Sequence, residues 1–221
     1  KDLTSNTGLQ YRFSYLCGRM NGDLTIGAEY NYNGLHDRML GYQRDITQKV
    51  HVVGVYAQNE WKNTHWSVLL GARLEKHNLL PKPVCTPRAT FRYTPVNGLV
   101  LRAGYSSGYR APQAYDEDLH VAAVGGNVSL ITLDPNLKPE YSHSATLSID
   151  WYRQFDALEV NLTAEGFYTY LQDVFFLRED GKDAAGNVLF TRTNARGAWV
   201  GGLNLEGKLN YQKRDFNFQL S

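Results

Sequence analysis

The side chains best suited to binding chemistry gather in one long segment near the middle of the chain. Tyr109 and Arg110 open this segment within a Tyr-Arg-Ala-Pro sequence, and Tyr115 follows shortly after. A tyrosine ring can stack on a planar ligand, and a guanidinium can hold a carboxylate through two parallel hydrogen bonds. The same residues could instead pack the segment, with Arg110 pairing with Glu140 or Asp118. The sequence leaves a binding role and a packing role open.

Two acidic stretches contain oxygen ligands that could hold a cation, and each also has a simpler explanation. Asp116, Glu117 and Asp118 form a run of carboxylates that could attract a cation or bind calcium, but such a run is also typical of a solvated loop. Residues 180–187 contain fragments of a calcium loop, but their spacing does not follow the EF-hand pattern. A hairpin turn explains residues 180–187 better.

The sequence carries no recognisable catalytic motif. It contains no G-x-S-x-G, P-loop or H-E-x-x-H sequence, and its 6 histidines are scattered. The formal net charge is +1, and no basic stripe is present. We therefore expect neither an enzyme nor a nucleic-acid partner.

Apolar and polar side chains alternate along most of the chain, which is the two-residue period of a β-strand. The segments with this period are Leu9–Cys17, Leu24–Tyr32, Val50–Trp61, Trp66–Leu74, Pro87–Thr94, Leu99–Ser107, Tyr141–Trp151, Ala157–Tyr170, Val200–Tyr211 and Phe216–Leu220. They amount to about ten strands of roughly ten residues, the length that a tilted strand needs to cross a bilayer.

The connections between these segments alternate in length. The short ones are Arg19–Asp23, Lys62–His65, Pro95–Gly98, Arg153–Ala157 and Lys213–Asp215, and the long ones are Gly34–Lys49, Lys76–Thr86, Gly108–Glu140 and Asp173–Gly197. Short turns at one end and long loops at the other are typical of an outer-membrane barrel. We predict an all-β fold, an antiparallel meander of about ten long strands that is part of a larger transmembrane β-barrel.

The aromatic residues also fit a membrane barrel. Several fall near the ends of the apolar faces: Tyr11, Tyr32, Trp61, Trp66, Tyr93, Trp151, Tyr170 and Tyr211. In a barrel these side chains would form a girdle at the lipid headgroups, whereas in a soluble sheet they would pack across strands. The opposite, polar faces carry charges of both signs and would line a wet or plugged lumen.

The two cysteines are not expected to form a disulfide. Cys17 should lie at the short-turn end of its strand, and Cys85 in a long loop at the other end, so the distance between them exceeds disulfide geometry. We expect small buried or lipid-facing thiols.

The chain reads as a piece of a longer barrel. It starts at Lys1 without a methionine or signal peptide, and Ser221 falls inside an alternating segment. We expect the exposed strand edges of such a piece to associate with another copy.

Six sequence blocks resemble one protein family and occur in the same order. They are GARLEKHNL, PRATFRYTP, LVLRAGYSSGYRAP, DPNLKPEYSHSATLSIDWY, LTAEGFYTYLQDVF and GLNLEGKLNYQ. Together they resemble the C-terminal barrel region of TonB-dependent outer-membrane receptors. The resemblance implies that residues 1–221 are a fragment of a plugged barrel of about 22 strands, without the plug domain and the remaining strands. It also implies uptake of a scarce, bulky nutrient across the outer membrane of a Gram-negative bacterium, driven by the TonB complex through the plug.

The same resemblance points to a candidate ligand. Haem receptors of the family carry a histidine between a Phe/Tyr-Arg-Ala-Pro motif and an Asn-Pro-Asn/Asp-Leu motif. His120 lies between such motifs at residues 109–112 and 134–137, although Asp134 replaces the first asparagine. Imidazole is a good axial ligand of haem iron, so His120 is a candidate metal ligand, and a ligand-free surface histidine is the alternative. The candidate ligand-binding residues are therefore Tyr109, Arg110, Tyr115 and His120.

Several functions remain open from the sequence. The transported ligand could be an iron complex such as haem or a siderophore, or a corrinoid such as vitamin B12, and no intrinsic cofactor is expected. The expected partners are the TonB complex, the lipid bilayer and the small-molecule ligand. The other classes are a passive porin and a soluble β-sandwich binding module, in which the apolar faces would meet each other.

Overall fold

The computed structural model describes residues 2–39, 44–113, 129–184, 186–211 and 214–220, and its regular elements are all β-strands. In chain order they are β1 (Asp2–Cys17), β2 (Met20–Met39), β3 (Arg44–Lys62), β4 (Trp66–His77), β5 (Val84–Val96), β6 (Leu99–Arg110), β7 (Ser129–Leu133), β8 (Glu140–Phe155), β9 (Leu158–Gln172), β10 (Phe175–Lys182), β11 (Val188–Asn194), β12 (Gly197–Tyr211) and β13 (Arg214–Leu220). No helix that could cross a membrane occurs in the described part of the chain.

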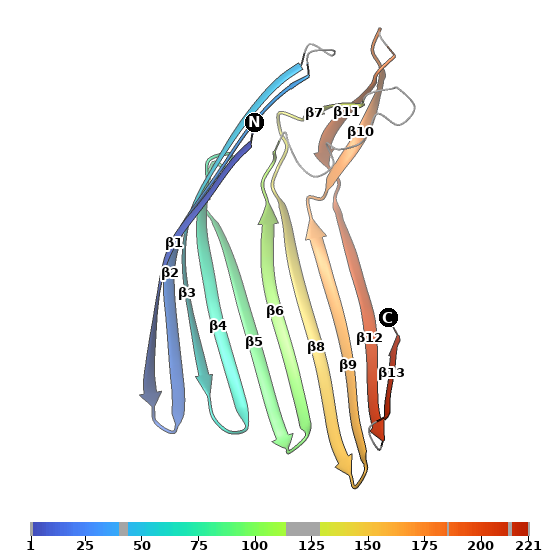
Figure 1. The fold of residues 1–221 in the computed structure, drawn as a ribbon. Coiled ribbons are helices and arrows are strands. Elements are labelled where there is room, and N and C mark those ends of the chain that lie inside the picture. Colours follow the sequence, from blue (N-terminus) through green and yellow to red (C-terminus); the bar gives the residue numbers. More distant parts are fainter. Residues whose placement is uncertain (1, 40–43, 114–128, 185, 212–213, 221) are drawn as a thin grey trace.

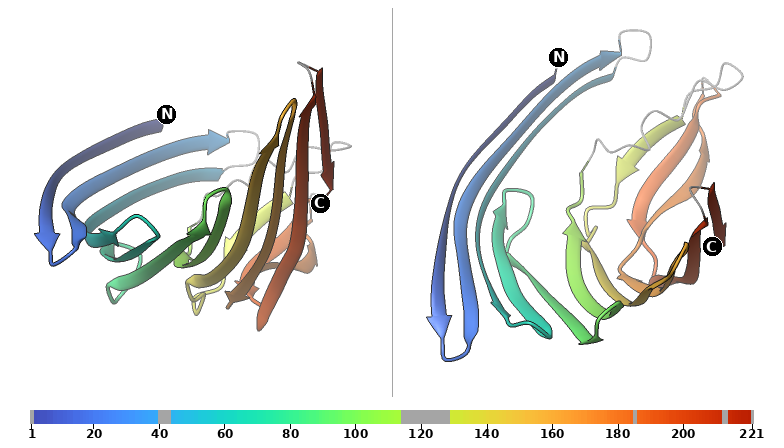
Figure 2. Two further views of the ribbon diagram at one scale, coloured as in Figure 1. Left: turned by 90° about the horizontal axis from the view of Figure 1, so that it is seen from below. Right: turned by 60° about the horizontal axis from the view of Figure 1, so that its bottom comes forward.

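Ten of these strands form one antiparallel sheet in the order β1-β2-β3-β4-β5-β6-β8-β9-β12-β13. Each strand pairs with the next wall strand in the chain, so the sheet is an up-and-down meander (Figure 1). The sheet is strongly curved, and β1 and β13 form its two open edges (Figure 2). The predicted fold class, a meander of long strands from a β-barrel, is confirmed. We call this sheet the wall.

The β2–β3 hairpin extends further than the sequence indicates. Residues 34–49 were expected to be a long loop, but the pairing of β2 with β3 continues to Met39 and Arg44. The pairing can continue because the hydrogen bonds between two strands join backbone groups and do not depend on apolar side chains. Polar residues such as Asn33, His36 and Gln48 occupy both faces here, so the alternation that reveals a strand is lost although the hydrogen bonds continue.

The short turns and the long connections lie at opposite ends of the wall, as predicted (Figure 1). In the turn between β5 and β6, the structure requires glycine at position 98. Gly98 has a positive φ of 84°, and a Cβ atom there would collide with the carbonyl oxygen of Tyr152. The Tyr152 amide donates a 2.7 Å hydrogen bond to the Gly98 carbonyl, so this turn is tied to the next hairpin.

Two of the predicted long loops contain a second, smaller sheet. β10 and β11 form an antiparallel hairpin, which confirms the turn expected at residues 180–187, and β7 pairs in parallel with β11. We call this three-stranded unit the rim sheet. The sequence analysis missed β7, β10 and β11 because these strands are short and the partners β7 and β11 are far apart in the chain.

Little of the apolar surface is buried within this chain. The only core cluster among the described residues contains Leu80, Val84 and Ala111, with Tyr109 and Tyr141 packed against it. By contrast, large apolar side chains on the wall are widely exposed, for example Leu9 at 80% and Leu147 at 61%. The β-sandwich alternative is wrong, because no second sheet covers this face in the described part of the chain.

Both cysteines are free and exposed, so the prediction that they do not pair is confirmed. Cys17 ends β1 beside a short turn. Cys85 was expected in a long loop, but it lies in β5 opposite Leu74. Its side chain belongs to the apolar surface described next.

Candidate functional site

The strand register sorts the wall into two chemically different faces. One row of directly paired residues across β1 to β5 is Leu9, Ala28, Val55, Leu74 and Cys85. A second row across β5, β6, β8, β9 and β12 is Ala89, Tyr105, Ala145, Tyr168 and Gly201. Because side chains alternate along a strand, both rows point to one face of the wall, and the residues next to them in sequence point to the other. We call the face with the two rows the apolar face and the opposite one the polar face.

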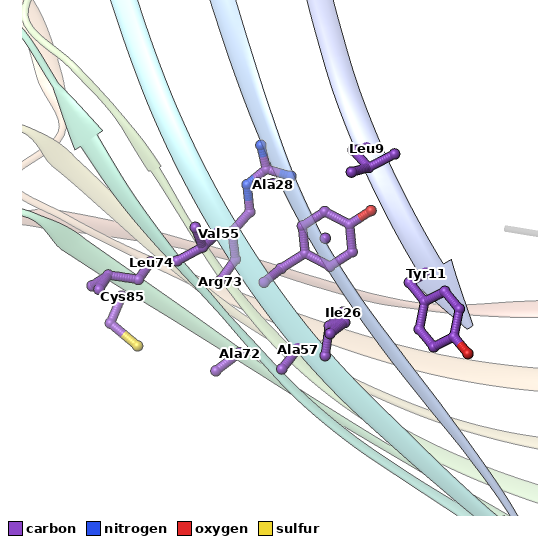
Figure 3. A pocket seen from close by; sticks show the side chains of 12 residues that line it. Leu9, Tyr11, Ile26, Ala28, Val55, Ala57, Ala72, Arg73, Leu74 and Cys85 are labelled. Carbon is purple, nitrogen blue, oxygen red and sulfur yellow. The ribbon is translucent and has the colours of Figure 1, made fainter. Parts of the chain in front are cut away.

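A hollow lies on the apolar face, over β1 to β5 (Figure 3). It has a volume of about 530 Å³, and Figure 3 shows Leu9, Tyr11, Ile26 and Val55 spread along it. Small-molecule sites combine an apolar lining with a few convergent polar groups. Arg73 also borders the hollow, but alternation assigns its side chain to the polar face. The hollow therefore suits contact with lipid chains and offers little to orient a polar ligand.

The polar face carries ion-pair networks instead. Near the short-turn end, Asp23 accepts hydrogen bonds from Lys62 at 2.7 Å and from the Ser14 hydroxyl at 2.5 Å, and Arg12 lies 3.1 Å away. These contacts join β1, β2 and β3. They neutralise the carboxylate without apolar burial, as expected for a wet interior.

A second network crosses the middle of the polar face. Arg73 on β4 contacts Glu29 on β2 and Glu75 on β4, both at 2.7 Å. The Arg73–Glu29 contact spans β3, where Gly54 has no side chain to block it; a Cβ there would lie 3.2 Å from the guanidinium. Further along, Arg102 on β6 pairs with Asp150 on β8.

The predicted candidates Tyr109 and Arg110 lie at the end of β6, at the rim. Tyr109 pairs with Tyr141 of β8 and packs on the small core cluster of Leu80, Val84 and Ala111. The His77 ring meets the Tyr109 ring edge-on, with the ring centroids 6.5 Å apart. These contacts fix the tyrosine beside the start of the segment from 111 to 139.

Arg110 lies where the rim sheet meets the wall. Its guanidinium lies 5.4 Å from the Phe175 ring centroid, and that of Arg192 lies 5.8 Å from the same centroid. Arg192 is only 1% exposed, and Glu140, the register partner of Arg110, accepts a 2.8 Å hydrogen bond from the Phe175 amide. Two cation–π contacts and one charge-assisted hydrogen bond thus converge on Phe175.

The segment before β8 is fastened to the rim sheet by Asn194. Its side chain accepts a hydrogen bond from the Lys138 amide at 2.8 Å and donates to the carbonyls of Lys138 at 3.1 Å and Asp173 at 2.6 Å. Asp134 adds a bond from its amide to the Arg192 carbonyl at 3.0 Å. The Asp-Pro-Asn-Leu motif therefore ends in a tightly bonded turn against β11.

The remaining sequence candidates lie outside the described residues. These are Tyr115, His120 and the acidic run Asp116, Glu117 and Asp118. Within the described ranges, no group of three or more histidine, cysteine, aspartate or glutamate side chains could hold a metal ion.

Sequence reasoning missed Phe175, Arg192 and Asn194. The alternating runs at residues 175–179 and 188–192 could have indicated short strands. Nothing in the sequence indicated that Arg192 would be buried.

Comparison with known proteins agrees with this geometry. The family model "TonB dependent receptor-like, beta-barrel" matches residues 1–221. The siderophore receptor PirA from Pseudomonas aeruginosa is similar in structure, with a TM-score of 0.73 at 18% identity over 99% of this chain and 48% of that chain. No curated protein sequence matches.

Two further solved structures share the fold. The ferric enterobactin receptor PfeA from Pseudomonas aeruginosa, in complex with enterobactin, has a TM-score of 0.69 at 16% identity over 99% of this chain and 40% of that chain. The hemophore receptor HasR of Serratia marcescens, in complex with its hemophore HasA and heme, has a TM-score of 0.71 at 14% identity over 95% of this chain and 39% of that chain. At these identities the likeness shows the fold alone, and the chain spans less than half of each of these proteins.

Proposed function

Since the chain belongs to the TonB-dependent receptor β-barrel family, we propose that it forms part of the wall of an outer-membrane receptor that binds an iron complex and takes it up with energy from the TonB complex. This is a family of outer-membrane transporters and not of enzymes. The observation that carries the proposal is the two-faced wall, whose apolar face suits lipid and whose polar face suits a filled interior. The porin alternative has no support from the family match.

In this proposal residues 1–221 are one section of a larger barrel, completed by further strands and by a plug domain that contacts the TonB complex. The exposed edges β1 and β13 support pairing with further strands, because an unpaired edge presents free backbone donors and acceptors. The ion pairs of Asp23 and Arg73 would then face the plug.

The proposed ligand is haem or a siderophore. The names of the similar structures, which are receptors for a siderophore, ferric enterobactin and a hemophore, favour an iron complex over a corrinoid such as vitamin B12. Both kinds of iron ligand are planar or bear oxygen donors, which suits tyrosine and arginine side chains at the rim.

Within this receptor we assign ligand contact to the segment between β6 and β8. His120 would ligate haem iron, and the Tyr115 ring would stack on the planar ligand. Tyr109 and Arg110 flank the start of the segment, and their contacts with His77 and Phe175 support a role in positioning it as well as in binding.

Titration of haemin into the full-length receptor that contains this chain tests the haem assignment. His120→Ala should abolish the Soret shift of the bound haem, because axial ligation sets this band. His65→Ala is the matched control, since His65 lies in the short turn between β3 and β4 at the opposite end of the wall. An unchanged Soret shift and affinity in His120→Ala would exclude His120 as the ligand, and binding of a ferric siderophore by the same protein would then identify the other ligand class.

A further inference from the structure

On β2 and β3, the apolar face carries polar side chains instead of apolar ones toward the end of the strands that lies away from the short turns. Three successive cross-strand pairs on this face contain hydrogen-bond donors: Tyr32 with His51, Gly34 with Lys49, and His36 with Thr47. The pairs directly before them, Tyr30 with Val53 and Ala28 with Val55, are mostly apolar. The register has no shift between these pairs, so all of them face the same way.

A hollow of about 430 Å³ lies over these donors. The residues that line it from the apolar face are Leu3, Tyr32, Gly34, His36, Thr47 and Lys49. Because Gly34 has no Cβ atom, the hydroxyl of Tyr32 occupies the space above it. A polar group therefore lines the hollow beside Gly34, and Leu3, which is 63% exposed, gives it an apolar side.

The side chains that line the hollow from the apolar face include one cation, Lys49. The ammonium group of Lys49 has no hydrogen-bond or ion-pair partner among the described residues, and none of the described side chains that line the hollow from this face is a carboxylate. Asp2 also borders the hollow, but it is paired with Leu35 and alternates to the polar face.

His51, the cross-strand partner of Tyr32, is held by two tyrosines next to the hollow. The Tyr30 hydroxyl lies 2.8 Å from its Nδ1 atom, and the Tyr32 ring packs on the imidazole with the ring centroids 4.9 Å apart. The second ring nitrogen of His51 takes no part in these contacts. This aromatic cluster is of the kind that lies at a membrane–water boundary.

The height of the hollow matches the headgroup layer. From Trp61, near the short turn, to His51 the strand runs roughly 33 Å at about 3.3 Å per residue. A strand tilt of about 40° reduces this to a height of roughly 25 Å, which is that of the apolar band in such barrels. Lys49 and Thr47 follow His51 on the same face, so they lie just outside the hydrocarbon.

We propose that this hollow binds the phosphorylated headgroup of a lipid in the outer leaflet. Phosphate oxygens would accept hydrogen bonds from Lys49, Tyr32 and Thr47, and the acyl chains would run down the apolar face past Ala28 and Val55. Basic pockets at a membrane surface bind anionic headgroups in this way. The inference depends on the proposed function only in assigning the apolar face to the membrane.

The other half of the wall, formed by β6, β8, β9 and β12, provides a comparison. At the same boundary β8, β9 and β12 present His143, Tyr170 and Trp199, and the next paired row is Tyr141, Gln172 and Gly197. The Tyr105 hydroxyl bonds to His143 Nδ1 at 2.9 Å, which repeats the tyrosine–histidine contact. That row has no cation, so it lacks the charge that Lys49 supplies on β3.

Native mass spectrometry of the full-length receptor in phosphatidylcholine nanodiscs tests the proposal, with bisphosphorylated lipid A and dephosphorylated lipid A as the two probes. The wild-type protein should retain the phosphorylated probe preferentially. Lys49→Gln should weaken this retention about fivefold, the effect of one cation near a charged surface, and Lys49→Arg should restore it. Lys182→Gln in the rim sheet is the matched control and should change nothing.

Three results would overturn the proposal: equal retention of both probes, an unchanged preference in Lys49→Gln, or displacement of the lipid by inorganic phosphate, which would indicate a site for the free ion. Insertion is measured separately by the heat-dependent shift of the folded band in gel electrophoresis. A protein that fails to insert contradicts the proposed function, whereas one that inserts without preference for the phosphorylated probe contradicts only this inference.

Discussion

The wall and the rim sheet are both β-structure, but they are built in opposite ways. Every wall strand pairs with the wall strand nearest in the chain, and most do so through a short turn. In the rim sheet, β7 pairs in parallel with β11, although β8, β9 and β10 lie between them in sequence. Local pairing can be specified by side-chain alternation, whereas distant pairing requires that other contacts bring the strands together first.

The two sheets also differ in what stabilises them. The wall exposes apolar side chains on one face and pairs charges on the other, so it depends on a lipid environment. The rim sheet is joined to the wall through Phe175, Glu140 and Asn194, by directional hydrogen bonds and cation–π contacts. A change of lipid contact should therefore affect the wall, and a change of hydrogen bonding should affect the rim.

The largest effect is expected for a charge on the apolar face. Leu147 lies in the middle of β8 and is 61% exposed on this face. Leu147→Arg should cost about 2–4 kcal/mol in a bilayer, as arginine does near the midplane of a barrel. Refolding into lipid vesicles, followed by the heat-dependent gel shift, measures the loss of the folded form.

The neighbour Thr146 supplies the control, because alternation directs it to the polar face. Thr146→Arg should fold nearly as well as the unaltered protein. Equal losses for the two variants would mean that the two faces are assigned wrongly.

A smaller and more local effect is expected at the rim. Asn194→Ala removes three hydrogen bonds to Lys138 and Asp173. We expect a local destabilisation of about 1–3 kcal/mol, because three hydrogen bonds are lost and each contributes about 0.5–1.5 kcal/mol at most at such partly exposed positions. Hydrogen exchange of the β10 and β11 amides should accelerate while that of β8 and β9 stays constant. Asn136→Ala is the control, and acceleration across the wall in Asn194→Ala would argue against an independent rim sheet.

The smallest effect is expected when the pH is lowered and Asp180 takes up a proton. Asp180 of β10 accepts a hydrogen bond from the Thr191 hydroxyl and pairs with Arg178 at 2.8 Å, and these contacts hold its pKa below the ordinary value of 3.8. Because folding lowers this pKa, the stabilisation is complete above the ordinary value and is lost as the pH falls through the lowered one. Carbon-13 NMR titration of the carboxyl group measures the shift directly.

The β10–β11 hairpin should become less stable as Asp180 takes up its proton. Asp180→Asn should remove that acid dependence, and Glu179→Gln should retain it. A hairpin that is equally sensitive to acid in Asp180→Asn would place the responsible group elsewhere.

The sequence by itself determined the wall. Alternation located the ten strands, assigned residues such as Leu147 and Thr146 to opposite faces, and separated the short turns from the long connections, because these features depend on neighbours along the chain. It also identified Tyr109 and Arg110 as rim residues, through the motif that begins at the end of β6.

Only the tertiary structure decided where the β2–β3 hairpin ends, how β7 meets β11, and that Arg110 and Arg192 converge on Phe175. These features join residues distant in sequence or continue a ladder where no apolar pattern marks it. The hollow beside Tyr32 belongs to the same class, since Leu3, Tyr32 and Lys49 come from three strands and meet only through the register. The physical reason is that backbone pairing and long-range packing carry no periodic signal in the sequence.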